Sequence, residues 1–220
     1  MQDRAVLLFT GGKDSIYTLH LLHDNLNLNI NYVRAVIIEP SLPQPNPHIK
    51  NRDIVIHISR LLGMEPIVVG PRRIDEELVR VARGAQVIAA GDIYLIDHAM
   101  WLASIARRAD VPAVYEPLFN MDTRALLKEI VDWGLEFTVI GVGSPRYRRL
   151  IGFQVNKDTL PRFMEEIEEY GIDPMGEFAE YHTLVNRVPG YPWRINYSLE
   201  AIEEEHGWLY ALVKHEVIHD

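Results

Sequence analysis

The sequence predicts an α/β fold, with a doubly wound, mostly parallel sheet followed by a smaller α+β part. Over the first two-thirds of the 220 residues, short apolar runs alternate with segments whose apolar residues recur at helical spacing. The apolar runs are continuous, which is typical of parallel strands that are covered on both faces. Ligands of such sheets bind at the carboxyl ends of the strands. We therefore expect the functional site in the loops that follow the strands.

The predicted elements follow one another in a regular order. Strands are predicted at residues 5–9, 33–38, 66–69, 86–91, 113–115 and 137–142. Helices are predicted at residues 16–26, 54–62, 96–106 and 126–131. The last helix is expected to begin near Asp122 or Thr123 and to end at Gly134. Four prolines between Pro40 and Pro47 indicate a loop.

The alternation of strands and helices ends near residue 144, where we place a domain boundary. Residues 1–144 are predicted as a nucleotide-binding domain and residues 145–220 as a smaller, substrate-binding domain. The second domain is predicted to contain an acidic helix over residues 160–167, with Gly171 just past its end.

Composition argues against several classes of protein. The formal net charge of −9 argues against a nucleic-acid partner, because such binding depends mainly on Lys and Arg side chains. The absence of cysteine excludes a disulfide framework, a thiolate metal site and a thiol nucleophile. No apolar run reaches the roughly 20 residues that a membrane span needs, and the first residues do not form a secretory signal. We therefore expect a cytoplasmic protein without a membrane partner. The oligomeric state stays open, a homo-oligomer included.

The strongest functional motif is the segment Thr10-Gly11-Gly12-Lys13-Asp14-Ser15, between the first predicted strand and the first helix. Paired glycines let the backbone turn sharply, and their amides can form an anion site with the helix N-terminus. The spacing is that of neither the Walker A loop nor the Rossmann fingerprint. The alternative is a tight turn with a capping Asp or Ser. Gly91 and Asp92 follow the fourth strand, so they are expected at the same edge of the sheet.

Three further segments carry a resemblance to a known family. They are His48-Ile49-Lys50-Asn51, Glu116-Pro117-Leu118-Phe119, and Gly171-Ile172-Asp173-Pro174-Met175-Gly176-Glu177-Phe178-Ala179-Glu180-Tyr181-His182-Thr183. Together with the glycine loop and Gly91–His98, they resemble the diphthine–ammonia ligases (diphthamide synthetases) of the ATP-pyrophosphatase, or PP-loop, superfamily. The loop of that superfamily reads S-G-G-x-D-S. The resemblance runs from about Ala5 to Val185 and implies an adenine nucleotide alpha hydrolase-like fold.

This resemblance implies a reaction. ATP would activate a carboxylate as its adenylate, and ammonia would convert the adenylate to an amide, with AMP and pyrophosphate as the other products. The acceptor would be diphthine on translation elongation factor 2. Residues Thr10–Ser15, Gly91 and Asp92 would bind ATP, and Lys13 would stabilise the leaving pyrophosphate. Mg²⁺ is expected as well, positioned by Asp14 or Asp92, because it prefers carboxylate and phosphate oxygens.

Glu177 and Glu180 are the expected catalytic residues on the acceptor side. With the rings of Phe178 and Tyr181 they would hold the acceptor's trimethylammonium group, or a glutamate would take a proton from ammonium. The alternative is a loop of solvated acids. The family's G-E-N-G-E reads Gly-Glu-Phe-Ala-Glu here, with Ala179 at the second glycine. Two other functions therefore stay open: a paralogue that adenylates another acceptor, tRNA included, and a module that binds ATP without turnover.

The histidines predict no metal site. His215-Glu216-Val217-Ile218-His219 matches the H-E-x-x-H pattern of zinc proteases, which needs both histidines on a helix. The β-branched pair inside the motif and the residues from Leu212 onward predict a terminal strand instead. For His182, a catalytic role and that of a hydrogen-bonded strand histidine are both open.

Overall fold

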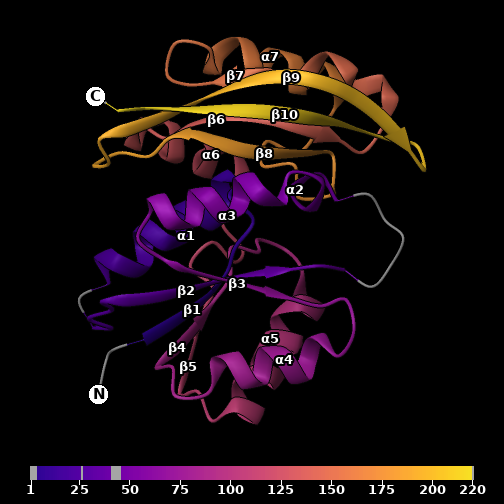
Figure 1. The fold of residues 1–220 in the computed structure, drawn as a ribbon. Helices are drawn as coiled ribbons and strands as arrows, with labels where there is room; N and C mark the ends of the chain where they lie inside the picture. The colour runs from indigo at the N-terminus through magenta and orange to yellow at the C-terminus, as the bar shows by residue number, and fades with distance from the viewer. Residues whose placement is uncertain (1–3, 26, 41–45, 220) are drawn as a thin grey trace. The chain divides into compact units, whose positions relative to one another are not determined.

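The computed structural model describes residues 4–25, 27–40 and 46–219, and the chain forms two compact units (Figure 1). The first unit contains residues 1–10, 14–43 and 55–120. The second contains residues 11–13, 44–54 and 121–220. The second unit thus begins its long segment at Met121, earlier than the boundary that we placed near residue 144.

The first unit is built on a parallel sheet of five strands. In chain order these are β1 (Arg4–Leu8), β2 (Tyr32–Ile38), β3 (Glu65–Val69), β4 (Val87–Ala89) and β5 (Ala113–Tyr115). Their order in the sheet is β3-β2-β1-β4-β5, and every pairing is parallel. The chain moves outward from β1 to β3, then returns to the other side of β1 for β4 and β5. The carboxyl ends of β1 and β4 therefore form the topological switch point, where ligands of open α/β sheets bind.

Helices cover both faces of this sheet. They are α1 (Lys13–Asp24), α3 (Arg52–Leu61), α4 (Ile74–Ala82) and α5 (Ile96–Ala109). Figure 1 shows α1 and α3 on one face of the sheet and α4 and α5 on the other. The apolar residues of α4 and α5 pack with those of the sheet strands into one core cluster. The predicted doubly wound α/β class is confirmed.

The helix α4 was not among the predicted elements. Its buried face is made of Leu78, Val79, Val81 and Ala82. Its N-cap is Arg73 in a left-handed conformation, with no side-chain cap. The acids of its first turn are a weak start signal, but no Ser, Thr, Asp or Asn stands at the N-cap of this nine-residue helix.

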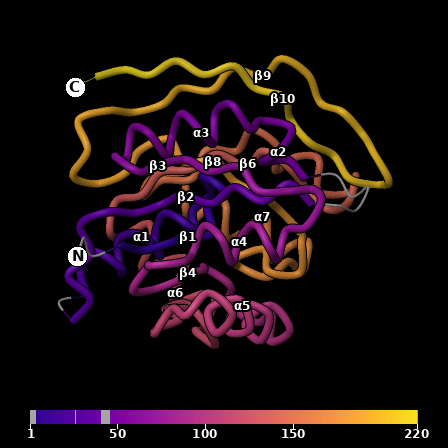
Figure 2. The backbone as a smooth tube through the Cα atoms, turned by 60° about the horizontal axis from the view of Figure 1, so that its bottom comes forward, coloured from indigo at the N-terminus to yellow at the C-terminus, as the bar shows by residue number. Residues whose placement is uncertain are grey.

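The second unit contains an antiparallel sheet with three helices and a 3₁₀ helix. The strands are β6 (Glu136–Val142), β7 (Gln154–Val155), β8 (Tyr181–Arg187), β9 (Trp193–Glu205) and β10 (Trp208–His219). The helices are α2 (Pro47–Lys50), α6 (Thr123–Trp133), α7 (Leu160–Tyr170) and the 3₁₀ helix η1 (Pro145–Leu150). The strand order is β10-β9-β8-β6-β7, and β10 pairs with β6 as well, so the sheet closes on itself. Figure 2 shows β9 and β10 following each other along most of their length.

The sixth predicted strand was placed in the wrong sheet. Residues 137–142 do form a strand, β6, but it pairs antiparallel with β7, β8 and β10 rather than with the parallel strands. Its burial along nearly every position resembles that of a parallel strand. The continuous apolar run predicted burial correctly, but it contains no information about the direction of the partner strands.

The helix ends of this unit follow the predicted signals. Asp122 is the N-cap of α6, and its carboxylate accepts a hydrogen bond from the Ala125 amide. Gly134 and Gly171 occupy left-handed C-cap positions after α6 and α7. The terminal strand is also confirmed as β10. Between Pro40 and Pro47, residues 41–45 lie outside the described part of the chain.

Asn51 attaches the short helix α2 to β10. Its side-chain amide donates to the carbonyls of Pro47 (2.8 Å) and Ala211 (2.9 Å), and its oxygen accepts from the Val213 amide (3.1 Å). The ladder between β9 and β10 shifts register at Leu212/Val213. The buried Asn51 side chain thus satisfies backbone groups on either side of this irregularity.

Replacing Asn51 with Ala should destabilise the protein. The change leaves one buried carbonyl and one amide of β10 without their partners, which costs about 2 kcal/mol or more. Urea unfolding measures this cost. The control is Asp53→Ala, two residues away on an exposed position, where we expect a change within about 0.5 kcal/mol. Equal effects of the two changes would contradict the bridging role of Asn51.

Candidate functional site

The predicted loop does lie between β1 and α1. Gly11 has a φ of +72°, which an L-residue rarely adopts, so a glycine is needed to turn the chain. The turn brings the hydroxyls of Thr10 and Ser15 within 3.3 Å of each other, and the Thr10 amide within 3.4 Å of Ser15 Oγ. Two hydroxyls therefore stand at the start of α1, a 12-residue helix whose N-terminal amides favour an anion.

Gly91 brings the end of β4 against the first turns of α1. A Cβ on Gly91 would lie 2.8 Å from Thr18 Oγ1 and 3.0 Å from the Asp14 carbonyl oxygen, so no side chain fits there. The loop after β1 and the segment after β4 are thus brought together at the switch point, as the sequence predicted.

Asp92 is bound to a histidine that we had given no role. The Oδ2 atom of Asp92 lies 2.6 Å from Nδ1 of His98, and this hydrogen bond raises the pKa of His98. The imidazole ring stacks on Trp101. His98 and Trp101 line a hollow of about 400 Å³, together with Asp92 and Leu95. Asp92 follows β4, and His98 lies in the first turn of α5. The sequence places the two residues near each other, but nothing in it indicates that they form a pair.

Glu116, at the end of β5, is a second acid near Asp92. Burial, and then the charge of Asp92, raise the pKa of its carboxyl group. Its Oε1 atom is buried without a hydrogen-bond partner among the described residues. Carboxylates thus follow both β4 and β5 at the ligand-binding edge of the sheet.

Lys13 points into residues 171–183, which we call the late Gly-Glu segment. Its side chain is only 2% exposed, its ammonium group donates to the Met175 carbonyl (2.7 Å), and it lies 4.9 Å from the centre of the Tyr181 ring. Its backbone amide donates to Thr183 Oγ1 (3.1 Å). The role of Lys13 as a pyrophosphate ligand stays a prediction, because the observed partners of its ammonium group are the protein's own.

The two glycines of the loop pack against β8. The Val185 amide donates to the Gly11 carbonyl (3.1 Å). A Cβ on Gly12 would lie 2.9 Å from the Thr183 carbonyl oxygen and 3.3 Å from the His48 ring. Gly12 is therefore required by close packing against this strand.

The late Gly-Glu segment is a turn held by its own acids. Asp173 Oδ1 accepts from the Met175 amide (2.8 Å) and, at 3.4 Å, from the Glu177 amide. The Glu180 carboxylate accepts from the amides of Asp173 (3.2 Å) and Phe178 (3.0 Å). Both oxygens of Glu180 thus hold the turn, so the contacts give Glu180 a positioning role. The catalytic roles of Glu177 and Glu180 stay predictions.

The aromatic residues of this segment do not form the predicted common pocket. Phe178 is 71% exposed, whereas Tyr181 is 2% exposed and donates its hydroxyl to the Pro174 carbonyl (2.5 Å). The cation that faces the Tyr181 ring is Lys13. The expectation that both rings hold an acceptor cation is therefore wrong for Tyr181, because the protein's own ammonium group takes that place.

Ala179, which stands where the family pattern has glycine, has a left-handed backbone conformation. Its φ is +63°, in the left-handed region where an L-residue costs about 1 kcal/mol. The neighbouring Gly143 confirms how tight the turn is, since a Cβ there would lie 2.3 Å from the Ala179 carbonyl oxygen. The turn is thus formed at the cost of backbone strain at Ala179.

Changing Ala179 to Gly should stabilise the protein by about 0.5–1 kcal/mol, because glycine adopts the left-handed conformation without a clash. Thermal or urea unfolding measures the gain. The matched control is Ala103→Gly on an exposed face of α5, which should destabilise by about 1 kcal/mol. If both changes destabilise, the strain at Ala179 is refuted.

Comparison with known proteins finds a likeness in the second unit. Residues 122–218 match the family model of the diphthamide synthase C-terminal domain. This part of the chain is therefore similar to that domain. It includes the late Gly-Glu segment and β8, to which Gly11–Lys13 are bound.

Other comparisons are more distant. Among solved structures, the chain is similar to the U34-tRNA thiolase NcsA from Methanococcus maripaludis with its [4Fe-4S] cluster, at 14% identity and a TM-score of 0.39. The similarity covers 60% of this chain and 58% of the thiolase chain, so this chain spans less than two-thirds of that relative's length. A search of curated proteins gave no match.

Two histidines of the second unit lie beside the loop. The rings of His48 and His182 meet edge to face with centroids 5.4 Å apart, and His182 also contacts Trp208 of the second unit. Burial, and then the charge of Lys13, lower the pKa of His182 to about 4. Its Nε2 atom is buried without a hydrogen-bond partner among the described residues, so His182 is a neutral, partly buried histidine. One of the two expected roles was that of a hydrogen-bonded strand histidine. Among the described residues, no group forms that hydrogen bond with Nε2.

The neutral state of His182 predicts a loss of stability in acid. The unfolded chain takes up this proton near pH 6.5, whereas the folded chain does so only near pH 4. The contribution of His182 to the free energy of unfolding is therefore complete above pH 6.5. It falls as the pH drops toward 4, by about 3 kcal/mol in total. We expect the free energy of unfolding of His182→Phe, which cannot titrate, to fall less between pH 7 and pH 4.5. Parallel curves for the two proteins would contradict the assignment.

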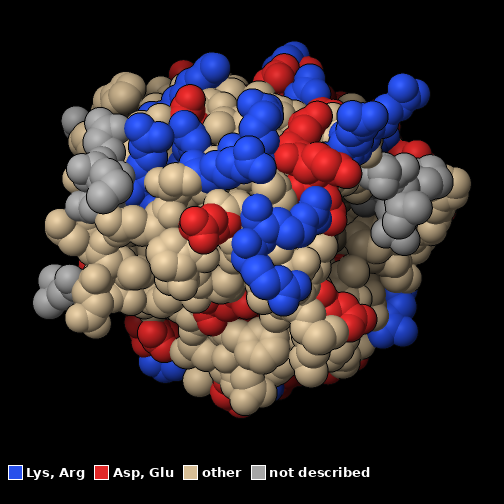
Figure 3. Space-filling view, turned by 90° about the horizontal axis from the view of Figure 1, so that it is seen from below, with Lys and Arg blue, Asp and Glu red and all other residues tan. Residues whose placement is uncertain are grey.

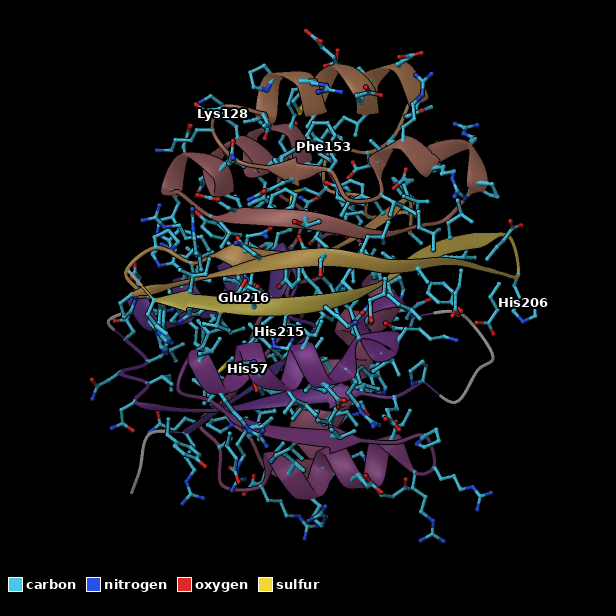
Figure 4. All side chains as sticks on the ribbon, turned by 45° about the horizontal axis from the view of Figure 1, so that its top comes forward. His57, Lys128, Phe153, His206, His215 and Glu216 are labelled. Atoms are coloured by element: carbon cyan, nitrogen blue, oxygen red, sulfur yellow. The ribbon has the colours of Figure 1, made fainter. Side chains whose placement is uncertain are left out.

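The H-E-x-x-H motif lies on the strand β10. His215 and Glu216 follow each other along this strand, and His206 lies at the turn between β9 and β10 (Figure 4). Four residues on a strand separate the Cα atoms of His215 and His219 by about 13 Å, too far to share one zinc ion. Among the described residues, no group of three His, Asp or Glu side chains converges as a metal site.

The surface charge is uneven. Lys and Arg side chains gather on the face shown in Figure 3, although the net charge is −9. The first unit has seven exposed arginines, which are Arg60, Arg72, Arg73, Arg80, Arg83, Arg107 and Arg108. The absence of a nucleic-acid partner therefore stays a prediction. No helix in the described ranges has the length and apolar character to cross a membrane.

Proposed function

We propose that the chain is an ATP-dependent carboxylate–ammonia ligase that amidates diphthine on translation elongation factor 2. The acceptor carboxylate would attack the α-phosphorus of ATP and release pyrophosphate. Ammonia would then attack the carbonyl carbon of the adenylate and release AMP. The match of residues 122–218 to the diphthamide synthase domain carries this proposal, since it supports an ATP-using amidation or adenylation role with a protein substrate.

The loop geometry supports the ATP half of the proposal. The hydroxyls of Thr10 and Ser15 stand together at the N-terminus of α1, where the helix dipole favours a negative charge. Preorganised donors at such a position stabilise the charge that develops on a leaving pyrophosphate. Asp14, in the first turn of the same helix, and Asp92 would supply carboxylates for Mg²⁺, which commonly binds through one or two carboxylates together with phosphate oxygens.

The link between loop and domain supports a shared function. Gly11, Gly12 and Lys13 are bound to Val185, Thr183 and Met175, all within the matched diphthamide synthase domain. A change in the turn around Met175 would therefore move the ammonium group of Lys13. This coupling is what an enzyme needs if nucleotide binding and acceptor binding are to depend on each other.

The altered Gly-Glu segment supports a second candidate, an adenylating enzyme with a different acceptor. Phe178, which stands where the family has asparagine, is 71% exposed and would change the surface that an acceptor meets. Ala179, at the position of the family's second glycine, has a left-handed backbone conformation, φ +63°, which glycine adopts readily. A module that binds ATP without turnover is the third alternative.

Asp14→Asn should reduce AMP release by a factor on the order of 10² or more, because it removes a charge at the loop while keeping the shape of the side chain. The measurement is formation of AMP and pyrophosphate from ATP, ammonium and diphthine-bearing elongation factor 2. Lys128→Ala, an exposed position on α6 (Figure 4), is the control and should be as active as the wild type. Lys13→Ala is less suitable, since the side chain is buried.

The products separate the alternatives. Amide formation together with AMP and pyrophosphate supports the ligase. Exchange of pyrophosphate into ATP with another carboxylate, and none with diphthine, supports the second candidate. ATP binding without AMP release from any acceptor would overturn both enzymatic functions, and unchanged AMP release in Asp14→Asn would remove the loop from the site.

A further inference from the structure

Six exposed arginines of the first unit lie on the neighbouring helices α4 and α5. We call them the arginine face; they are Arg72, Arg73, Arg80, Arg83, Arg107 and Arg108. The Asp75 carboxylate on α4 joins the two helices, because it accepts from the Trp101 indole and from the Arg108 guanidinium group, at 2.9 Å each. Figure 3 is seen from the side of these helices and shows the basic side chains that gather there.

Most of these arginines have no partner for their charge. Within the described residues, Arg108 alone of the six forms an ion pair, which is the one with Asp75. Glu76 and Asp110 are the only exposed acids at residues 70–91 and 101–112, all of which the structure describes. The face is therefore positive, although the chain has a net charge of −9. At physiological salt, charges more than about 8 Å away are largely screened, so the local excess determines what binds here.

Arginine supplies every side-chain cation of the first unit other than histidine. This unit contains no lysine, since all the lysines of the chain lie in the second unit. A guanidinium group presents a planar fork of N–H donors that can bind two oxygens of a phosphate at once, and its flat face can stack on a ring. It also keeps its charge at every physiological pH. This residue type therefore fits a nucleic-acid backbone.

The arginine face lacks the apolar centre of a protein interface. No Val, Leu, Ile, Met or aromatic side chain is exposed at residues 70–91 and 101–112, a stretch that is described throughout. The exposed Ile96 and Met100 lie in the first half of α5, whereas its two arginines lie in the last turn. Protein partners usually bury apolar and aromatic side chains at the centre of the contact, with polar groups at the rim. A charged backbone is therefore favoured over an acidic protein surface.

The face is too long for one small anion. From Arg73 to Arg83 the helix rises by about 15 Å, and Arg107 and Arg108 lie on the second helix. A single phosphate can reach only one or two of these guanidinium groups. A strand of nucleic acid carries a charge at every nucleotide, so successive phosphates can meet successive arginines.

We propose that the arginine face binds single-stranded RNA through its phosphate backbone. The phosphates pair with guanidinium groups, and unpaired bases stack on the planes of these groups, as is common where proteins bind single-stranded RNA. Contacts to phosphates carry no sequence information, so this binding is independent of sequence. The inference concerns a separate surface and does not rest on the proposed function.

The test is fluorescence anisotropy of a labelled, unpaired 20-nucleotide RNA that is titrated with the whole chain. If about five phosphates are neutralised, the logarithm of the binding constant should fall against the logarithm of the salt concentration with a slope of about −3.5. Arg80→Ala/Arg83→Ala/Arg107→Ala removes three unpaired members of the face. It should weaken binding by about 30-fold or more and reduce the slope to about −1.5.

A triple variant with the same loss of charge is the control. Arg60→Ala/Arg148→Ala/Arg149→Ala removes three exposed arginines outside the face and should bind RNA with the wild-type slope, because distant charges are screened. Equal losses of affinity in the two triple variants would show that only the net charge matters and would overturn the proposal. No binding of RNA at 50 mM salt, or tighter binding of duplex DNA, would overturn it as well. Binding of polyglutamate as tightly as RNA would instead assign the face to an acidic protein.

The outcome is separate from the ligase reaction, because RNA binding is measured without ATP or an acceptor. Asp14→Asn, which is expected to lower AMP release, should bind RNA as the wild type does. The Arg80→Ala/Arg83→Ala/Arg107→Ala variant should release AMP at the wild-type rate. A variant that loses both activities together would contradict a separate surface.

Discussion

The buried ammonium group of Lys13 is the constraint on which the site depends. A charge that is removed from water needs close polar partners, and here these are the Met175 carbonyl and the face of the Tyr181 ring. The Met175 carbonyl is in turn presented by the turn that Asp173 holds. Residues 162 positions apart in the sequence thus form one hydrogen-bonded structure.

This constraint explains several features of the late Gly-Glu segment. Its acids bind backbone amides, which keeps the turn in one shape. Ala179 stays in a left-handed conformation because the surrounding hydrogen bonds determine the backbone there. In a segment built this way, surface residues such as Phe178 can change without moving the Met175 carbonyl. A different side chain on the surface of this segment is therefore compatible with an unchanged glycine loop.

The switch point of the parallel sheet contributes a different kind of chemistry. The loop after β1 supplies hydroxyls at a helix N-terminus, and the segments after β4 and β5 supply Asp92, His98 and Glu116. The imidazole of His98 is held by a carboxylate and by Trp101, so its orientation is fixed before any ligand arrives. In the second unit, by contrast, His182 is neutral, and its Nε2 atom is buried. The pKa values of the two histidines shift in opposite directions because His98 has a carboxylate partner, whereas burial and then the charge of Lys13 act on His182.

The sequence by itself determined the α/β class, five strands of the parallel sheet, most helix ends and the position of the glycine loop. These features depend on neighbours in the chain: Asp122 caps α6 through an amide three residues away, and Gly134 ends the same helix. Tertiary structure alone decided which sheet β6 joins, that α4 forms without a cap, and that Tyr181 faces Lys13 rather than a ligand. An apolar run is equally suited to parallel and antiparallel partners, so its sheet is chosen by packing with distant strands. Likewise, the partner of a buried ammonium group is set by the fold, because the groups that can receive its charge lie far away in sequence.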